Sequence, residues 1–470
     1  MDTPINLSLH AAQSIAAELL SLLPPESDAA PARAAAERLI AYHPRVLVSG
    51  LCSVGKSSFV SALWGDSDVL PTAVRDCTQT NTLIRRPGLN ETDRSIRLAF
   101  LPRDKALHFA TQGPAFYRLT ALIDETLGPA APRFDEMLPE QRLTEAVAIT
   151  RRLFQEQPNL YILHEQLTDA LEELEQFLAF IQSPAYRAGE KSAAKWDDRR
   201  AHLMGIRRPD GRTLETGRLL SLEYVEIIRD NSAPGIELEL LDTPWIPAYH
   251  EARRTELILE QSLSADILIA IALPLPFTFE DWVLKAFRAR PELVKRTIVL
   301  FNQADTIDSA ALFSRDGFAA VFQHNVETLT KLGIDPAHIF LSCARLPFLT
   351  HAASLNADPA IPERIQKLKK TLDRLRFQTD GRPASDFTRK LQRACDPADA
   401  GIETLRGKLN ELAAGPVLHA RVLELARALE ALPELPLPNE LRERLLQLQM
   451  SAKPMRSNSF GGVPDSRSLL

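Results

Sequence analysis

Apolar residues along the chain follow two different periods, and each period marks out a set of elements. Residues 5–23 and 164–182 carry apolar side chains three and four positions apart, which predicts amphipathic helices. Short runs rich in Val, Ile and Leu predict buried strands at 45–50, 80–85, 95–100, 222–230, 236–244, 265–273, 296–305 and 338–344. Because most of the later strands are separated by helical sequence, we predict an α/β fold with a mostly parallel sheet flanked by helices.

Helical patterns dominate the remaining parts of the chain. Residues 1–43 predict N-terminal helices, residues 416–450 predict C-terminal helices that pack with them, and a large helical insertion is expected at about 103–220. The terminal helices either form a neck bundle or cover the sheet, and the insertion either docks a partner or acts as a cap. The main α/β domain is then 44–415, and the Ser-, Gly- and Pro-rich residues 451–470 are predicted to be disordered.

Composition narrows the classes of function. The formal net charge is −6, from 55 basic and 61 acidic residues, so no broad basic field is available to bind nucleic acid. The four cysteines lack CxxC spacing, and no signal peptide is evident, which favours the cytoplasm. The most apolar run, 265–275, is about half the length of a membrane-spanning helix and predicts a buried strand instead.

The sequence Gly50-Leu-Cys-Ser-Val-Gly-Lys-Ser57 matches the GxxxxGK[ST] pattern and lies between a predicted strand and a predicted helix. In that context the backbone N–H groups of the loop and the helix N-terminus point at phosphate oxygens. Lys56 is expected to reach the β- and γ-phosphates, and the Ser57 hydroxyl to bind Mg²⁺. The residues predicted to contact the phosphates are Gly50, Ser53, Val54, Gly55, Lys56, Ser57 and Ser58.

Two further residues are candidates for the Mg²⁺ site. Thr78 lies in the threonine-rich segment 70–82 after the first helix, although a hydroxyl at the edge of a strand is an equally good interpretation. Asp242 ends the predicted strand IELELLD and would bind Mg²⁺ through water, the alternative being a turn cap.

The base-binding end is predicted from two later strand ends. Asn302-Gln-Ala-Asp305 follows one strand, and an acid there can accept hydrogen bonds from N1–H and N2–H of guanine, a donor pair that adenine lacks. Ser342 and Cys343 follow the next strand, where backbone N–H groups could contact the base. Open α/β sheets bind ligands at these carboxyl ends of strands.

Taken together, these motifs resemble those of bacterial dynamin-like GTPases. The resemblance rests on GLCSVGKSSFVSALWG, LPTAVRDCTQTNTLIRR, DTPW, ADILIAIALPLPFT with FEDWVLKAF behind it, NQAD and SCA, which follow the family's order across residues 44–414. It implies that 44–415 is a dynamin-type GTPase domain that binds GTP or GDP with Mg²⁺. It also implies catalytic roles for Ser53, Lys56 and Thr78, with Ser53 placing water and a monovalent cation such as K⁺.

The resemblance further implies how the protein acts. The family hydrolyses GTP after forming a homodimer through the nucleotide face, so we expect the same here, with another dynamin-like protein as a partner and a peripheral position at the inner membrane. The long stalk of the family is not evident. Two departures, Trp245 after DxP and Gln303 where lysine is usual, leave an alternative open, a nucleotide-gated interaction scaffold with little or no hydrolysis.

Overall fold

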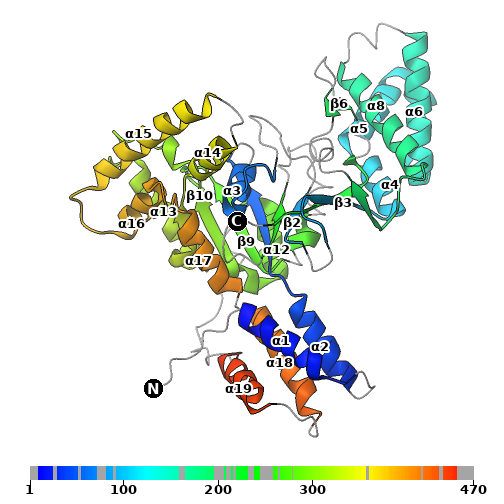
Figure 1. Ribbon diagram of the computed structural model, residues 1–470. Coiled ribbons are helices and arrows are strands. Elements are labelled where there is room, and N and C mark those ends of the chain that lie inside the picture. Colours follow the sequence, from blue (N-terminus) through cyan, green and yellow to red (C-terminus); the bar gives the residue numbers. More distant parts are fainter. Residues whose placement is uncertain are drawn as a thin grey trace. The chain divides into compact units, whose positions relative to one another are not determined.

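The structure is a computed structural model of the chain (Figure 1). It describes residues 9–24, 29–50, 54–70, 81–87, 91–157, 165–194, 206–207, 213–214, 219–230, 238–243, 258–262, 265–277, 279–355, 359–413, 416–432 and 438–452. The chain forms two compact units. One comprises Met1–His43 with Leu409–Leu470, and the other comprises Pro44–Lys408.

A large sheet organises the unit Pro44–Lys408, and the described residues contribute nine strands to it (Figure 1). In spatial order these are β11 Ile339–Leu341, β10 Thr297–Phe301, β9 Ile267–Ala272, β1 Arg45–Gly50, β8 Glu239–Asp242, β2 Thr82–Arg85, β7 Leu222–Ile228, β3 Ser95–Phe100 and β4 Lys191–Ala194. The five strands from β11 to β8 are parallel, as are β2 and β7. The pairs β8–β2, β7–β3 and β3–β4 are antiparallel. The predicted α/β class with a mostly parallel sheet is confirmed.

The parallel half of the sheet is built from near-continuous apolar runs. Every residue of β10 is buried, and so are the interior residues of β1. Leu47, Leu241 and Leu268 are neighbours in register on one face, where they pack against Trp282 and Val283. Strands covered on both faces are expected to read as continuous rather than alternating apolar sequence, which explains these runs.

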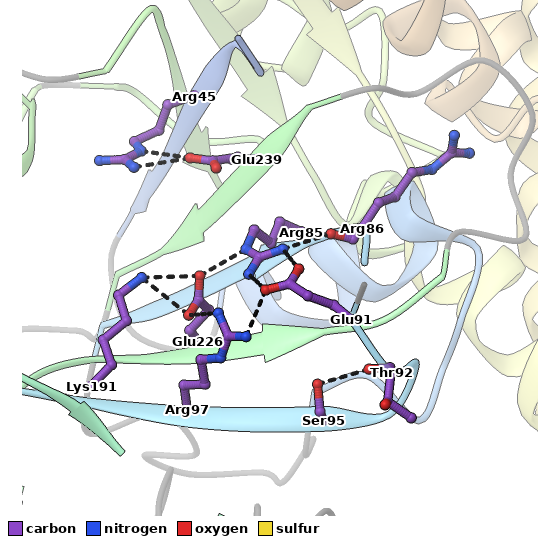
Figure 2. Close-up of polar contacts among 10 residues, drawn as sticks. All are labelled: Arg45, Arg85, Arg86, Glu91, Thr92, Ser95, Arg97, Lys191, Glu226 and Glu239. Atoms are coloured by element: carbon purple, nitrogen blue, oxygen red, sulfur yellow. Dashed lines mark hydrogen bonds and ion pairs between the residues drawn. The ribbon is translucent and has the colours of Figure 1, made fainter. Parts of the chain in front are cut away.

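The antiparallel half carries a buried ionic network instead, shown in Figure 2. Glu226 of β7 has a side chain only 2% exposed, and it accepts hydrogen bonds from Arg85 Nε at 2.7 Å and from Lys191 Nζ at 3.1 Å. Arg97 of β3 lies opposite Glu226 in register and forms an ion pair with Glu91 at 2.7 Å. These charges therefore join four strands across one face of the sheet.

Helices flank the strands of this unit and account for much of its core. They are α3 Lys56–Trp64, α12 Asp281–Ala289, α13 Phe318–Lys331, α14 Arg345–Ser354, α15 Ile361–Thr379, α16 Asp386–Cys395 and α17 Ile402–Ala413, with 3₁₀ turns η6 Pro291–Arg296, η7 Ala304–Thr306 and η8 Pro336–His338. Phe301 of β10 packs against Phe318 and Phe322 of α13, and Phe387 of α16 contacts both of these rings.

The predicted helical insertion is largely helical, with a hydrophobic core of its own. It contains α4 Arg103–Thr111, α5 Pro114–Leu127, η2 Gly128–Ala130, η3 Phe134–Glu136, α6 Pro139–Glu156 and α8 Glu165–Ile181. Strands that were not predicted lie near its end: β4 returns to the main sheet, and β5 Ile206–Arg207 pairs with β6 Thr213–Leu214. The sequence of β4, KSAA, has no apolar alternation because an edge strand buries little.

The other unit is a helical bundle of the two chain ends. Its helices are α1 Leu9–Leu22, α2 Ala30–Ile40, α18 Pro416–Glu430 and α19 Asn439–Ala452. Leu19, Leu39 and Leu418 are fully buried in one shared core. The helix α19 continues to Ala452 rather than ending at Met450, and residues 453–470 lie outside the described part of the chain. Among the described residues, no helix is both long and apolar enough to cross a bilayer.

Candidate nucleotide-binding site

The predicted phosphate loop leaves β1 at Gly50 and enters α3 at Lys56. Gly50 approaches β9 so closely that a Cβ atom there would lie 2.3 Å from the carbonyl oxygen of Ile271. Gly55 has φ +83°, a left-handed conformation that other residues adopt only at a cost. Both glycines are therefore required by the backbone path, which brings the N-terminus of α3 to the carboxyl end of β1.

Lys56 lies across this loop. Its Nζ donates a hydrogen bond to the carbonyl oxygen of Gly50 at 2.6 Å, and the residue is only 9% exposed. This acceptor is neutral, and an anionic phosphate oxygen that took its place would form a stronger, charge-assisted bond.

Ser57 and Asp242 meet where α3 begins and β8 ends. The Ser57 hydroxyl donates to Asp242 Oδ2 at 3.2 Å, and Asp242 is fully buried. Thr243 fixes the end of β8 on β1, because its N–H and its hydroxyl both donate to the carbonyl oxygen of Val48. A hydroxyl and a carboxylate are the hard oxygen donors that Mg²⁺ prefers, so this donor set fits the ion. The described residues include no group of three His, Cys, Asp or Glu that could hold a metal.

Asn302, at the end of β10, connects the two ends of the site. Its Nδ2 donates to the carbonyl oxygen of Val54 at 2.9 Å, and its Oδ1 accepts from Ser342 Oγ at 3.0 Å and from the N–H of Ala344 at 3.1 Å. The residue is 2% exposed. One amide side chain therefore satisfies groups on the phosphate loop and on the loop after β11.

Asp305 lies beside the same two loops. The Cys343 thiol donates to Asp305 Oδ1 at 3.4 Å, and Arg345 Nη1 lies 3.9 Å from Oδ2. Burial raises the pKa of the Cys343 thiol, and the negative charge of Asp305 raises it further, so the thiol stays protonated. The Asp305 side chain remains 11% exposed, which leaves its carboxylate accessible to a ligand at the edge of the sheet.

The structure therefore brings most of the predicted residues to one edge of the sheet. Gly50, Val54, Gly55, Lys56, Ser57 and the half-buried Ser58 lie at β1 and α3, beside Asp242, and Asn302, Asp305, Ser342 and Cys343 lie at the ends of β10 and β11. Ser53, Thr78 and Trp245 lie outside the described residues. The binding and catalytic roles of all these residues stay predictions.

Three features of this region were not predicted from sequence. Gln303 has φ 62°, and this left-handed turn separates Asn302 from Asp305. Ala400 also has positive φ, and its carbonyl oxygen accepts from the N–H of Cys343 at 3.1 Å. Arg406 of α17 donates to the carbonyl oxygens of Ala62 and Leu63, which stabilises the last turn of α3. A basic residue one turn into a distant helix carries no local signal of this contact.

The fold and the site define an α/β protein of P-loop architecture, with a strand, a glycine-bounded loop and a helix at the centre of a mostly parallel sheet. No protein-family model matches this sequence, and no curated protein matches it.

Two chains of solved structures are similar to this one. Both structures are described as an oligomerised bacterial dynamin pair that provides a mechanism for long-range sensing and tethering of membranes. One matches with a TM-score of 0.44 and 14% identity over 93% of this chain and 47% of its own. The other matches with a TM-score of 0.46 and 13% identity over 94% of this chain and 57% of its own. This chain thus spans about half the length of the structures it matches.

Proposed function

We propose that the protein is a GTP-binding and GTP-hydrolysing switch of the dynamin-like kind. The observation that carries this proposal is the arrangement around Asn302, which links the phosphate loop at Val54 to the loop after β11. Lys56 lies at one end of that arrangement and the accessible carboxylate of Asp305 at the other. A nucleoside triphosphate has charge at one end and a base at the other, and it fits this separation of groups.

In this proposal Lys56 exchanges the Gly50 carbonyl oxygen for a phosphate oxygen. The backbone N–H groups at the start of α3 face the same phosphates, and together they stabilise the charge that develops as water attacks the γ-phosphate. Asp305 accepts hydrogen bonds from N1–H and N2–H of guanine. Adenine cannot make this pair of bonds, so the site should select guanine.

Ser57 and Asp242 are the described residues that would hold Mg²⁺, with Thr78 proposed as a further ligand. Bound Mg²⁺ would supply neutralisation of phosphate charge. Ser53 is proposed to place the attacking water and a monovalent cation such as K⁺. Both Ser53 and Thr78 are proposed from the motif resemblance.

The same resemblance supports the proposals on assembly. These are a homodimer formed through the nucleotide face, a second dynamin-like protein as partner, and a cytoplasmic chain that works peripherally at the inner membrane. Activation by dimerisation would make hydrolysis per molecule rise with protein concentration.

The test is a titration of labelled GTP and labelled ATP against the wild type, Lys56→Ala and Lys191→Ala. Loss of the ammonium group should weaken GTP binding by about 100-fold or more, as expected for a charged group that contacts phosphate. Lys191→Ala is the control, because its lysine is paired with Glu226 in the antiparallel half of the sheet. Equal affinity for ATP and GTP would reject the guanine assignment, and no binding of either nucleotide would reject the proposal.

A second candidate function is a nucleotide-gated scaffold with little or no hydrolysis. Gln303 favours it, because the side chain at this turn is neutral where the resembling family carries lysine. Phosphate release that rises with protein concentration and with potassium would support the enzyme over the scaffold, whereas GTP binding without release would support the scaffold.

A further inference from the structure

One side of α15 presents a row of cations that ends in an aromatic ring. Lys367, Lys370, Arg374 and Phe377 follow one another at spacings of three, four and three residues, so they lie along one side of the helix. The opposite side, with Leu368, Leu372 and Leu375, is buried in the core. We call Lys367, Lys370 and Arg374 the basic stripe.

The basic stripe belongs to a part of the chain with a charge opposite to that of the whole. Residues 361–393 contain ten Lys or Arg and four Asp or Glu, a net charge of about +6 in a chain whose formal net charge is −6. All three residues of the stripe are exposed. No described carboxylate forms an ion pair with any of them. Like charges three or four residues apart on a helix repel one another, whereas Glu363 lies four residues before Lys367 and Asp373 three after Lys370.

Phe377 lies at the C-terminal end of this row and is 73% exposed. The turn that follows, residues 380–386, is exposed throughout. Figure 1 shows α15 alongside α14 and α16, both of which it contacts. These contacts use the leucine side of the helix, so they leave the ring and the three cations facing outwards.

We propose that this face of α15 is a docking surface for an anionic lipid bilayer. Charge complementarity selects an anionic partner, and a lipid surface attracts exposed cations without requiring any exact arrangement of them. The exposed phenyl ring at the end of the stripe can enter the boundary between headgroups and acyl chains. Single-stranded nucleic acid is instead bound in basic grooves that follow its backbone, whereas this stripe occupies one outward-facing side of one helix. The proposal deepens the peripheral membrane position proposed above, on which it rests, by naming the surface that contacts lipid, and it does not depend on nucleotide binding.

The experiment is co-sedimentation of the full chain with vesicles of mixed phosphatidylcholine and phosphatidylserine, and with vesicles of phosphatidylcholine alone. The wild type should sediment with the mixed vesicles only. Lys367→Gln/Lys370→Gln/Arg374→Gln should lower partitioning about 100-fold, as expected for three cations near an anionic surface. Phe377→Ala should lower it several-fold, and this loss should persist at high salt, because burial of the ring is not screened.

The matched control is Arg118→Gln/Arg152→Gln/Arg315→Gln, which removes three exposed cations outside α15. It should bind mixed vesicles as the wild type does. A wild type that stays in the supernatant, a stripe variant that still sediments, or an equal loss in the control would each overturn the proposal. So would tighter, stripe-dependent binding to a single-stranded oligonucleotide than to mixed vesicles.

Labelled GTP is titrated against the same preparations. Unchanged GTP binding by the stripe variant, together with its loss of vesicle binding, supports the proposal and shows that the variant is folded. Failure of every variant and of the wild type to bind GTP would reject the proposed function alone, since the vesicle result stands by itself.

Discussion

The two halves of the sheet place their charged groups in different positions. In the parallel half, the polar groups that matter lie at the carboxyl ends of buried apolar strands, as Lys56, Asp242 and Asn302 do. In the antiparallel half, the charges lie on one face of the strands themselves, as Glu226 and Lys191 do. Glu226 is buried, as Lys56, Asp242 and Asn302 are, but only the groups of the parallel half meet at an edge where a ligand could reach them.

The difference shows how to tell a binding site from a structural network. In the antiparallel half, Glu226 accepts bonds from Arg85 and Lys191, so its charge is already neutralised within the protein. In the parallel half, Lys56 donates to the neutral carbonyl oxygen of Gly50, and the Asp305 side chain, 3.9 Å from Arg345, remains 11% exposed. A charge compensated by ions on the face of a sheet holds strands together, whereas polar groups that meet at the carboxyl ends of strands are candidates for ligand binding.

The largest effect on stability should follow from Glu226→Ala. It leaves Arg85 and Lys191 without their shared carboxylate, and we expect a loss of about 3 kcal/mol in the free energy of unfolding. Denaturant unfolding measures it, with Glu239→Ala as the control. Glu239 forms its own ion pair with Arg45 at 2.9 Å, but that pair is more exposed, so its loss should cost about 1 kcal/mol or less. Equal losses of unfolding free energy in the two variants would contradict the structural role given to Glu226. Weaker GTP binding by folded Glu226→Ala would contradict the separation of the ionic network from the binding site.

A smaller loss of stability, combined with a loss of binding, should follow from Asn302→Ala. The change leaves the carbonyl oxygen of Val54 and the N–H of Ala344 without their partner, which should cost about 2 kcal/mol. It should also weaken GTP binding by about 10-fold or more, because both loops lose their common support. The matched control is Asn325→Ala, which removes another buried asparagine that bonds Phe277 N–H and the Leu275 carbonyl. If the control loses as much affinity for GTP as Asn302→Ala, the special position of Asn302 is disproved.

The smallest expected effect is the change with pH in the stability that Glu226 contributes to the antiparallel half. Burial opposes ionisation of Glu226, but the hydrogen bond and charge of Arg85, with those of Lys191, hold its pKa below the ordinary value of 4.5. Its contribution to stability should therefore be present above pH 4.5 and be lost as the pH falls below that value through the lower folded-state pKa. The difference in unfolding free energy between the wild type and Glu226→Gln should narrow in that range. A difference that is constant or grows on acidification would show that the carboxylate is not stabilised.

The sequence predicted the parallel half of the fold better than the antiparallel half. In the parallel half, the strand Arg45–Gly50 was predicted to the residue, because an apolar run that ends in glycine has few alternatives. In the antiparallel half, the strand Ser95–Phe100 was also predicted to the residue. The strand Lys191–Ala194 was missed, because an exposed edge strand needs no apolar pattern and its pairing depends on a charge on β7. The directions of the strands in the antiparallel half could not be predicted, because the long connections between these strands leave no periodic pattern in the sequence.

The candidate site, too, could be predicted from sequence only in part. Motif spacing and strand order were enough to predict that Lys56, Ser57 and Asp242 lie together, since all follow from the ends of neighbouring strands. The bond from Asn302 to Val54 joins residues 248 positions apart and ends on a backbone carbonyl, which every residue possesses. No local pattern could have singled out that partner. The sequence does not predict the left-handed turn at Gln303 either, because glutamine has no preference for this conformation.

The amide of Asn302 has a consequence for how a ligand is recognised. Because one rigid side chain braces both loops, neither loop can shift without straining the other. On the proposed function, inorganic triphosphate would contact one of these loops and guanosine the other, whereas the intact nucleotide would contact both at once. The intact ligand should therefore bind more favourably than the summed binding free energies of its two fragments, because its two ends are covalently joined.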